Sequence, residues 1–377
     1  MEQEVLTAVS ALFTGETPTL TAAAKEEAVR QTVYSLVADD DAALRYIGGS
    51  IRVCQEQKAV VNALEGLPFA VIKGLAAAIY YPAPLRRTMG DIDVITTPAA
   101  FAPACDALLA AGFTARDPLD GNERHVHFRR NGVTVELHRR FAACNTREQE
   151  ELLDGWIYDA LAAPMPAEVE GYAFPMLPDE LNGLVLLDHI SQHLESGLGL
   201  RQILDWVMYV DRVLTDEWWE SFREKTDRLG LTTLAVVSAR IGQRRLGAYP
   251  RLNWCASHDQ LAEDLLGYIF SCGNFGTKLG KKAAVTMVMS QGKGNAFAHL
   301  QKRGEENWKA LARHPWLKPL AWLYQAGRYA HRALRRGVSA AEWKASYEAS
   351  KKRNELIERL GGLQLSVRER EGEKPRT

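Results

Sequence analysis

The sequence has few cysteines, no long apolar run and almost no net charge, and each shortage excludes a class of protein. Its five cysteines are scattered among 377 residues without the spacing of metal ligands, so we expect neither a disulfide framework nor a cysteine zinc site. No run approaches the roughly 18 apolar residues of a membrane-spanning helix. The first residues, Met1-Glu2-Gln3-Glu4, differ from the basic start of a signal peptide. We therefore expect a cytoplasmic protein with reduced thiols and no transmembrane segment.

The net charge of −1 hides an uneven distribution of charge along the chain. Residues 1–270 carry 24 Lys and Arg against 38 Asp and Glu, whereas residues 271–377 carry 22 against 9. The last third is thus a basic segment on an acidic body. The length predicts two or three domains, and a composition of 46% hydrophobic residues supplies ample material for their cores. The sequence contains no internal repeat and no Walker-type phosphate loop.

One stretch, residues 69–97, has the pattern of a strand, a tight turn, a helix, a loop and a second strand. Residues 69–72 are a short apolar run, as a buried strand requires. Gly74 follows where the backbone turns into an Ala-rich helix at 75–80, and Pro82 ends that helix. Gly90 opens the second strand, which carries Asp91-Ile92-Asp93.

Asp91 and Asp93 are predicted to point the same way, because alternate residues of a strand share a face. Two neighbouring carboxylates disfavour each other's ionisation, and a divalent cation removes that conflict. Mg²⁺ suits this place, since it binds carboxylates, water and substrate phosphates. The Gly74 turn also opens a helix whose first amide groups can bind a phosphate. The alternative at this point is an edge strand with two solvated aspartates.

A third acid follows on a predicted hairpin. The strand-like residues 126–130 and 133–138 flank Asn131-Gly132, which is a strong hairpin signal. Alternation along the second run places Glu136 and His138 on the face opposite its apolar residues. Glu136 is therefore predicted to lie beside the Asp-x-Asp strand and complete a triad of carboxylates. Two Mg²⁺ ions in such a triad can clamp an in-line displacement at phosphorus.

These motifs, in this order, resemble those of the polymerase-beta-type nucleotidyltransferase superfamily, and more closely those of a group of bacterial, largely uncharacterised nucleotidyltransferases. The resemblance covers about residues 68–140. Its elements are Lys73-Gly74, Tyr81-Pro82, Arg87 four residues before Asp-x-Asp, and Glu136-Leu137-His138. The chain departs from the superfamily at Leu75, where a serine or a second glycine is usual. Phosphate binding at this turn would then fall to backbone amides and Lys73.

The resemblance implies a Mg²⁺-dependent transfer of a nucleoside monophosphate from an NTP to a hydroxyl acceptor, with release of pyrophosphate. Asp91, Asp93 and Glu136 would bind two Mg²⁺ ions and carry the catalysis, with Glu136 as a metal ligand or as the general base. The residues expected to bind the nucleotide are Lys73, Gly74, Leu75, Arg87, His138, Arg201 and Asp205. A small-molecule acceptor is the first expectation, and a protein or a tRNA end is the alternative.

The helical second half contains two polar pairs with a spacing of four residues. They are His189 with His193, and Arg201 with Asp205. Similar nucleotidyltransferases carry a comparable signature, which implies that Arg201 faces the triphosphate while Asp205 fixes it. Two other interpretations stay open: the histidines bind a metal together with a carboxylate, or these polar residues join two buried helices.

Other patterns have two interpretations each. His125 and His127 share a face of the first hairpin strand, where they are solvated or paired across strands, or contact the nucleotide or acceptor. The aromatic and basic residues of 314–336 suit a nucleic acid or an anionic membrane, but a core helix with a basic rim explains them equally well. We also predict a glycine-rich link at 273–294 and a disordered end at 368–377.

The expected fold is α+β: a small mixed β-sheet nucleotidyltransferase (palm-like) domain, flanked by helices and followed by a larger helical domain, with the NTP in the cleft between them. We predict an N-terminal helical segment at 1–66 that packs on the catalytic sheet, a catalytic domain at 67–178 and a helical domain with a basic tail at 179–377. Leu75 favours one rival function, a degenerate nucleotide sensor. The basic tail favours two others, a toxin- or defence-type nucleotidyltransferase and an assembly partner.

Overall fold

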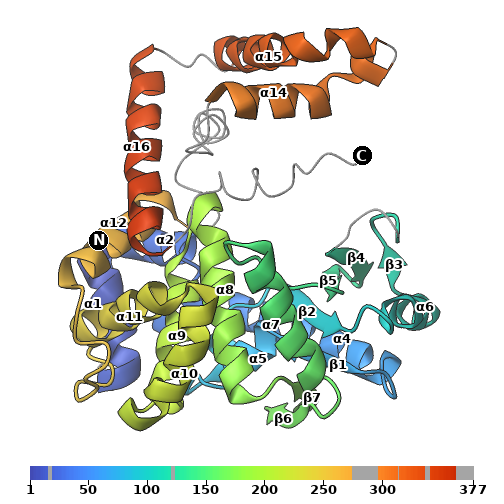
Figure 1. Ribbon diagram of the computed structural model, residues 1–377. Coiled ribbons are helices and arrows are strands. Elements are labelled where there is room, and N and C mark those ends of the chain that lie inside the picture. Colours follow the sequence, from blue (N-terminus) through green and yellow to red (C-terminus); the bar gives the residue numbers. More distant parts are fainter. Residues whose placement is uncertain (16–18, 120–123, 274–295, 313, 336–339, 362–377) are drawn as a thin grey trace.

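The computed structural model describes residues 1–15, 19–119, 124–273, 296–312, 314–335 and 340–361. At its centre is a seven-stranded mixed sheet in the order β3-β4-β5-β2-β1-β7-β6 (Figure 1). The strands are β1 (Phe69–Ile72), β2 (Asp91–Thr96), β3 (Thr114–Ala115), β4 (His125–Arg130), β5 (Val133–His138), β6 (Met165–Val169) and β7 (Tyr172–Met176). The expected α+β class is confirmed.

The three central strands bring the predicted motifs together. β1 pairs antiparallel with β2, and β2 pairs parallel with β5. The connection from β1 to β2 runs through the short helix α5 (Gly74–Ala78) and the 3₁₀ turn η1 (Pro84–Arg86). In this register Asp93 lies directly opposite Glu136. The strand positions predicted for the carboxylates are therefore neighbours in the sheet.

Two hairpins extend the sheet on either side. β4 and β5 turn at Asn131 and Gly132, whose φ angles are +49° and +83°. Positive φ at both turn residues matches the twist of the flanking strands, which is why Asn-Gly predicted this hairpin. β6 and β7 turn in the same way at Glu170 and Gly171. The sequence predicted only a short strand near 172–174, because Pro166 and Pro175 disguise the alternation of this second hairpin.

The sheet is buried on both faces, since alternate residues of β1 enter two different cores. Phe69 and Val71 pack with α4 (Asp41–Ala63) and α6 (Phe101–Ala110), whereas Ala70 and Ile72 join the core of the helical half. The helices of that half are α8 (Asp179–Ser196), α9 (Leu200–Arg212), α10 (Asp216–Leu229), α11 (Thr232–Ile241), the π-helical turn η2 (Gly242–Leu246) and α12 (Asp259–Cys272). α7 (Arg147–Ala160) also packs on this side.

The first three helices belong mainly to the core of the helical half. They are α1 (Glu2–Thr14), α2 (Ala22–Arg30) and α3 (Tyr34–Val37). Their apolar residues share one cluster with α8 to α12. The buried Gln31 side chain donates to the carbonyl of Ile269 and accepts from the amide of Leu200. The same cluster also contains Ala70 and Ile72 of β1 and Ile95 of β2, so α1 to α3 share a core with the sheet as well as with the helical half, and α4 packs with Phe69 and Val71.

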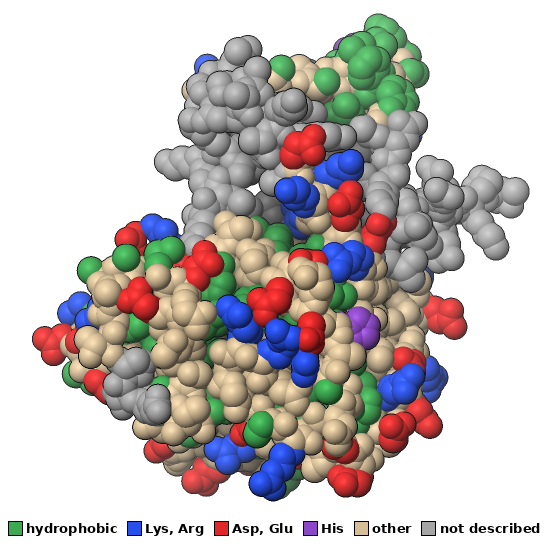
Figure 2. All heavy atoms as spheres, turned by 90° about the vertical axis from the view of Figure 1, so that its left-hand side faces the viewer, with side chains coloured by type: hydrophobic (Ala, Val, Ile, Leu, Met, Phe, Trp, Pro, Cys, Tyr) green, Lys and Arg blue, Asp and Glu red, His purple; other side chains and the backbone are tan. Residues whose placement is uncertain are grey.

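The last helices form an arm beyond this body. α14 (Ala296–Asn307), η4 (Lys309–Ala312), η5 (Pro315–Leu320) and α15 (Ala321–Arg335) fold back on one another, and α16 (Ala340–Arg359) returns to α12 (Figure 1). Exposed apolar side chains gather at the far end of the arm (Figure 2). The exposed large apolar side chains of the arm include Phe297, Trp316, Leu320 and Leu323. The arm thus has both a buried seam and an apolar outer surface.

Other boundaries agree closely with the sequence. The helix predicted at 99–111 spans Phe101–Ala110, and α7 starts at a Thr146–Gln149 capping box. α8 begins directly after Pro178, although the division into domains at this residue stays a prediction. The predicted link at 273–294 and the predicted disordered end at 368–377 lie almost wholly outside the described residues.

Candidate active site

A pocket of about 230 Å³ lies where the strand–turn–helix–strand unit meets α8 and α9. Eight of the predicted site residues line it: Lys73, Gly74, Arg87, Asp91, Asp93, Glu136, His138 and Arg201. The other lining residues are Met89, Gly90, Arg124, His125, Phe141, His189, Gln192 and His193. The cleft expected between sheet and helices is therefore present, and it contains both acidic and basic groups.

Asp93 and Glu136 meet at the floor of this pocket. They are paired across β2 and β5, and their carboxylate oxygens lie within 4.8 Å of one another and of a His138 ring nitrogen. Asp91 is two residues earlier on the same face of β2, at the exposed end of the strand. Ile92 and Val94 on the opposite face are fully buried. The alternation predicted for both strands is confirmed.

Lys73 supplies the cation that balances Asp93. Its Nζ lies 2.5 Å from Asp93 Oδ1 and 5.7 Å from the centre of the Phe141 ring. The Lys73 backbone has φ +55° and ψ −138°, a conformation that costs a non-glycine residue about 1–3 kcal/mol. The strand therefore ends in a strained turn that directs a lysine, placed directly after β1, toward the carboxylates.

The three acids have different electrostatic surroundings. Burial alone would raise the pKa of Asp93, but the Lys73 ammonium and a hydrogen bond from His138 hold it well below its usual range. The hydrogen bond from His138 also lowers the pKa of Glu136. Although Asp91 is at the exposed end of β2, the surrounding protein atoms displace part of the water around its carboxylate. This desolvation and the nearby Asp93 raise the pKa of Asp91 to about 6. The site thus carries more negative charge than its lysine balances.

His138 joins the two strands of the site from its buried position at the end of β5. Its Nε2 lies 3.2 Å from Asp93 Oδ1 and 3.4 Å from Glu136 Oε2. The prediction that His138 shares the face of Glu136 and can orient a carboxylate is consistent with this geometry.

Arg87 is bound to Asp205 in the protein interior. Its Nε and Nη2 donate to the two oxygens of Asp205 at 2.6 and 2.7 Å, and the Tyr81 hydroxyl donates to the same carboxylate at 2.8 Å. Both partners of the ion pair are almost fully buried. The expected pairing of Asp205 with Arg201 is therefore wrong: a planar guanidinium from the β1–β2 connection occupies both carboxylate oxygens. Asp205 is not among the residues that line the pocket.

Arg201 faces the pocket with part of its guanidinium unsatisfied. Its Nη1 donates to the carbonyl of Thr88 at 2.7 Å. Its Nε is buried and has no hydrogen-bond partner within the described structure. Burial and the neighbouring Arg87 lower the pKa of Arg201. A buried donor without an acceptor is costly, so this side of the pocket favours an anionic ligand.

Leu75 does not line the pocket. Its side chain is fully buried in the core beneath the sheet, with Val53 and Val71 in the same cluster. The phosphate-binding role expected for Leu75 is thus not available to its side chain, because the helix α5 turns that position inward. Gly74 does line the pocket, and a Cβ atom at this residue would meet nothing within 4 Å.

His189 and His193 form a pair on α8 across the pocket from the acids. Their Nε2 atoms lie 3.0 Å apart. Burial lowers the pKa of His189 well below its usual range and that of His193 to about 4, and Lys73 adds to both effects. Within the described residues, neither belongs to a group of three side chains that could hold a metal. The part of the chain that the structure describes therefore supplies no third ligand for the metal interpretation of this pair.

We expect the His189–His193 pair to make stability fall in mild acid. Unfolded histidines take up protons below their ordinary pKa of about 6.5, whereas burial lowers the pKa of folded His193 to about 4 and that of folded His189 well below its usual range. Stability contributed by the neutral pair is therefore complete above pH 6.5 and lost between pH 6.5 and 4. Urea unfolding across this range should show a steeper loss for the natural protein than for a His189→Gln, His193→Gln variant, by up to about 1.4 kcal/mol per pH unit for each histidine. Equal slopes would contradict this account.

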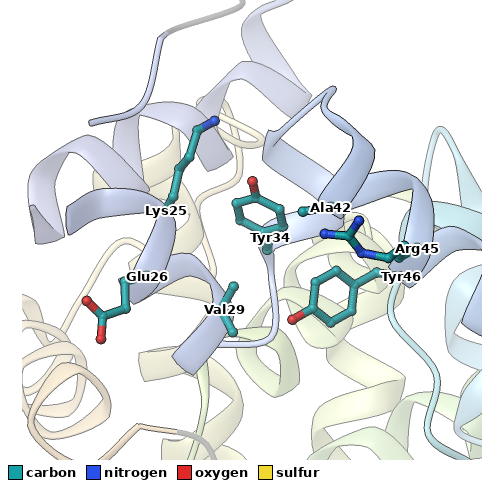
Figure 3. Close-up of a pocket in the computed structure, with 7 residues that line it drawn as sticks. All are labelled: Lys25, Glu26, Val29, Tyr34, Ala42, Arg45 and Tyr46. Atoms are coloured by element: carbon teal, nitrogen blue, oxygen red, sulfur yellow. The ribbon is translucent and has the colours of Figure 1, made fainter. Parts of the chain in front are cut away.

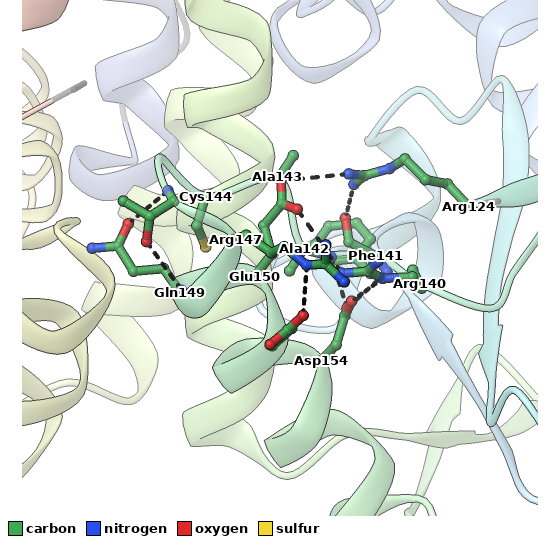
Figure 4. Close-up of polar contacts among 12 residues, drawn as sticks. Arg124, Arg140, Phe141, Ala142, Ala143, Cys144, Arg147, Gln149, Glu150 and Asp154 are labelled. Carbon is green, nitrogen blue, oxygen red and sulfur yellow. Dashed lines mark hydrogen bonds and ion pairs between the residues drawn. The ribbon is translucent and has the colours of Figure 1, made fainter. Parts of the chain in front are cut away.

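The segment after β5 holds Phe141 in the pocket wall, a role that the sequence did not reveal. Asp154 of α7 accepts hydrogen bonds from the amides of Phe141 and Ala142, and also binds Arg140 (Figure 4). Asp188 of α8 accepts from the amide of Ala143. Two buried carboxylates on two helices therefore fix the chain that carries Phe141. The one hint in the sequence was the position of Asp188, which directly precedes His189 of the predicted histidine pair.

A larger pocket, of about 360 Å³, lies among α2, α3 and α4 (Figure 3). Its lining residues are Lys25, Glu26, Val29, Tyr34, Ala42, Arg45 and Tyr46. None of the predicted site residues lies there, and it lacks a cluster of carboxylates. We therefore locate the chemistry in the smaller pocket.

The sheet presents the Asp-x-Asp motif beside a third acid, Glu136. Basic groups from the β1–α5 turn and from α9 face these acids across the pocket. This arrangement is that of a nucleotidyltransferase-type protein. The chain belongs to the family described as uncharacterised nucleotidyltransferase, whose model matches residues 17–247. It is therefore a transferase of the nucleotidyltransferase (EC 2.7.7) type. The match includes the whole sheet and the helices that form the pocket, and it ends before the basic last third. A search of curated proteins found no match.

None of the described helices combines the length and the apolar character needed to cross a bilayer.

Proposed function

We propose that the protein transfers a nucleoside monophosphate from an NTP to a hydroxyl acceptor. The acceptor oxygen forms a bond to the α-phosphorus, the bond from that phosphorus to the leaving oxygen breaks, and pyrophosphate departs with the electron pair. One observation carries the proposal: Asp93 and Glu136 lie in register on neighbouring strands with oxygens within 4.8 Å, and Asp91 shares their face. This reaction belongs in the cytoplasm, where the five buried cysteines, which form no disulfide, would stay reduced.

Two Mg²⁺ ions suit this donor set. Asp91, Asp93 and Glu136 offer carboxylate oxygens, the ligands that this hard cation prefers. Among the described residues that line the pocket, Lys73 is the only lysine, and it contacts Asp93. Bound Mg²⁺ would stabilise the charge on the transferring phosphate. Glu136 and Asp93 would hold the metal from two strands, while Asp91 would join from the exposed end of β2.

The basic wall of the pocket suits the triphosphate. Arg201 offers a buried Nε without a hydrogen-bond partner within the described structure, and Gly74 leaves open space beside the β1–α5 turn. Lys73 and Arg124 also line the pocket. A phosphate oxygen would satisfy Arg201, and the backbone can approach it closely at Gly74. Arg87 also lines the pocket, but the two described hydrogen bonds that its side chain donates both go to Asp205.

The proposal is tested by incubating the purified protein with each of the four common NTPs, with Mg²⁺ or with a chelator. We expect pyrophosphate release with at least one NTP, and a rise in melting temperature that requires both the NTP and Mg²⁺. Nucleotide binding that is independent of metal and gives no product would contradict the enzyme and support a nucleotide sensor. An NTP labelled at the α-phosphate identifies the acceptor, because the label appears in small molecules, in protein or in RNA.

Glu136→Gln should lower turnover at least ~10²-fold while nucleotide binding stays largely intact. The variant keeps the size of the side chain but removes its charge and its ability to accept the hydroxyl proton, and a positioned base contributes about this much to the rate. Glu168→Gln, on the outer hairpin strand β6, is the matched control and should leave the rate unchanged. If Glu136→Gln turns over at the rate of the natural protein, Glu136 has no catalytic role.

A further inference from the structure

A second cluster of possible metal ligands lies on the β4 side of Glu136. The side chains of His125, His127 and Glu136 each offer one ligand atom, and these atoms lie within 4.8 Å of one another. All three side chains are partly exposed, so an ion can reach them. The His125 and His127 rings meet edge to face with centres 4.8 Å apart. The cluster therefore has the composition of a site with two imidazoles and one carboxylate.

The hairpin fixes these residues on one face. His127 lies directly opposite Glu136 across β4 and β5, and His125 is two residues earlier on β4. Their neighbours Val126, Phe128 and Val135 are fully buried on the other face. Ligands on paired strands with buried neighbours hold their relative positions without a bound ion, which lowers the cost of ordering a site.

Asp117 orients His127 toward the centre of the cluster. Its carboxylate contacts His127 Nδ1 and also accepts a hydrogen bond from the His127 amide at 3.1 Å. This leaves His127 Nε2 directed at Glu136 Oε1, at 3.4 Å. Histidines that bind metals commonly donate their other ring nitrogen to a carboxylate, which fixes the tautomer and the ring orientation. Asp117 lies outside the ligand group and has the place of such a partner.

The two carboxylate oxygens of Glu136 face different clusters of side chains. Oε1 faces His127 and Oε2 faces His138, which also contacts Asp93. A carboxylate in this position can belong to two neighbouring ion sites. The two sites differ in chemistry, because imidazole suits zinc, copper, iron and nickel, whereas carboxylates alone suit magnesium and manganese.

We propose that His125, His127 and Glu136 bind one divalent cation of the kind that prefers imidazole ligands, such as Zn²⁺, with Asp117 as a positioning residue. The site adjoins the Asp91–Asp93–Glu136 site and shares Glu136 with it, but it is built on β4 and selects a different metal. The proposal depends only on the arrangement of these side chains. It stands whether or not the protein transfers nucleotides.

The test measures metal binding directly. The full-length protein is stripped with a chelator, and Co²⁺ and Zn²⁺ are titrated in millimolar Mg²⁺, with visible absorption reporting Co²⁺ coordination and calorimetry reporting Zn²⁺. We expect one equivalent of Zn²⁺ that excess Mg²⁺ does not displace. The single variants His127→Ala and His125→Asn should each lose Zn²⁺ binding. Asp117→Asn should lower the affinity for Zn²⁺ about 10- to 100-fold.

Controls separate this site from other histidines and from the acidic site. His258→Asn replaces an exposed histidine with φ +64°, which asparagine tolerates, and should leave Zn²⁺ binding unchanged. Asp93→Asn should also retain one equivalent of bound Zn²⁺.

The proposal is overturned if the natural protein binds no Zn²⁺ in excess Mg²⁺, or if correctly folded His125→Asn and His127→Ala both bind it normally. Loss of Zn²⁺ binding in Asp93→Asn with retention in both histidine variants would assign the ion to the acidic site instead. Pyrophosphate release, measured on the same samples, reports the proposed transfer reaction separately.

Discussion

The variant Asp93→Asn should lose its Mg²⁺-dependent turnover of NTP by at least ~10³-fold, more than the loss of a general base alone. Asp93 is almost fully buried and lies between Lys73, His138 and Glu136. An asparagine of the same shape keeps an oxygen for Lys73 but removes the negative charge that a cation needs. Pyrophosphate release is the first readout. The second is the rise in melting temperature on adding NTP with Mg²⁺, which should disappear.

Asp106→Asn is the matched control for that variant, because Asp106 is an exposed residue of α6 outside the pocket. It makes the same chemical change and should leave both readouts as they are in the natural protein. Circular dichroism of both variants checks that the fold is retained. If Asp93→Asn releases pyrophosphate at the natural rate, the carboxylates of this pocket do not hold a catalytic metal.

The variant Arg87→Ala should lower the free energy of unfolding by about 3–5 kcal/mol, as expected when one partner of a buried ion pair is removed. Asp205 would remain in the interior with only the Tyr81 hydroxyl among its described side-chain partners. Because the pair joins the β1–β2 connection to α9, its loss should also loosen the pocket wall that carries Arg201. Urea unfolding followed by circular dichroism measures the change.

A double variant distinguishes the cost of leaving one charge unpaired from the cost of losing the packing of the Arg87 side chain. In Arg87→Met, Asp205→Leu both charges are absent, and no carboxylate is left uncompensated. We expect this protein to be markedly more stable than Arg87→Ala, so that the two substitutions are not additive. Arg223→Ala provides the comparison with an exposed pair, since Arg223 and Asp227 are about half exposed, and should change stability by less than about 1 kcal/mol. A loss of that small size in Arg87→Ala would show that the buried pair does not hold the two parts together.

Local patterns in the sequence predicted the parts of the site that depend on strand alternation. Asn131-Gly132 predicted the β4–β5 hairpin, and alternation then fixed the faces of Asp91, Asp93 and Glu136. The hairpin also led to the prediction that the Glu136 strand lies beside the Asp-x-Asp strand, a pairing that periodicity alone does not specify and that the structure contains. The structure agrees on both points, because the buried apolar face of each strand leaves only one register.

The sequence was less informative where distant segments meet. Arg201 and Asp205 are one helical turn apart, so local spacing suggested a pair. Nearly every residue of α9 is buried, however, and the two side chains meet different partners. Asp205 therefore binds Arg87, 118 residues earlier. The contact between Asp117 and His127, which are only ten residues apart, was also not predicted. The positive φ of Lys73 was also not predictable, because such a backbone is expected at glycine.

The packing of α1 to α3 against the far end of the helical half has a consequence for synthesis on the ribosome. Gln31 finds its partner at Ile269, 238 residues later, and translation at about 5–20 residues per second takes roughly 12–50 seconds to cover that distance. Throughout this interval the first apolar helix faces have no completed core to enter, although the sheet can already assemble from residues 69–176. The nascent chain should therefore recruit a chaperone through its amino-terminal helices, and release it only after α12 has emerged.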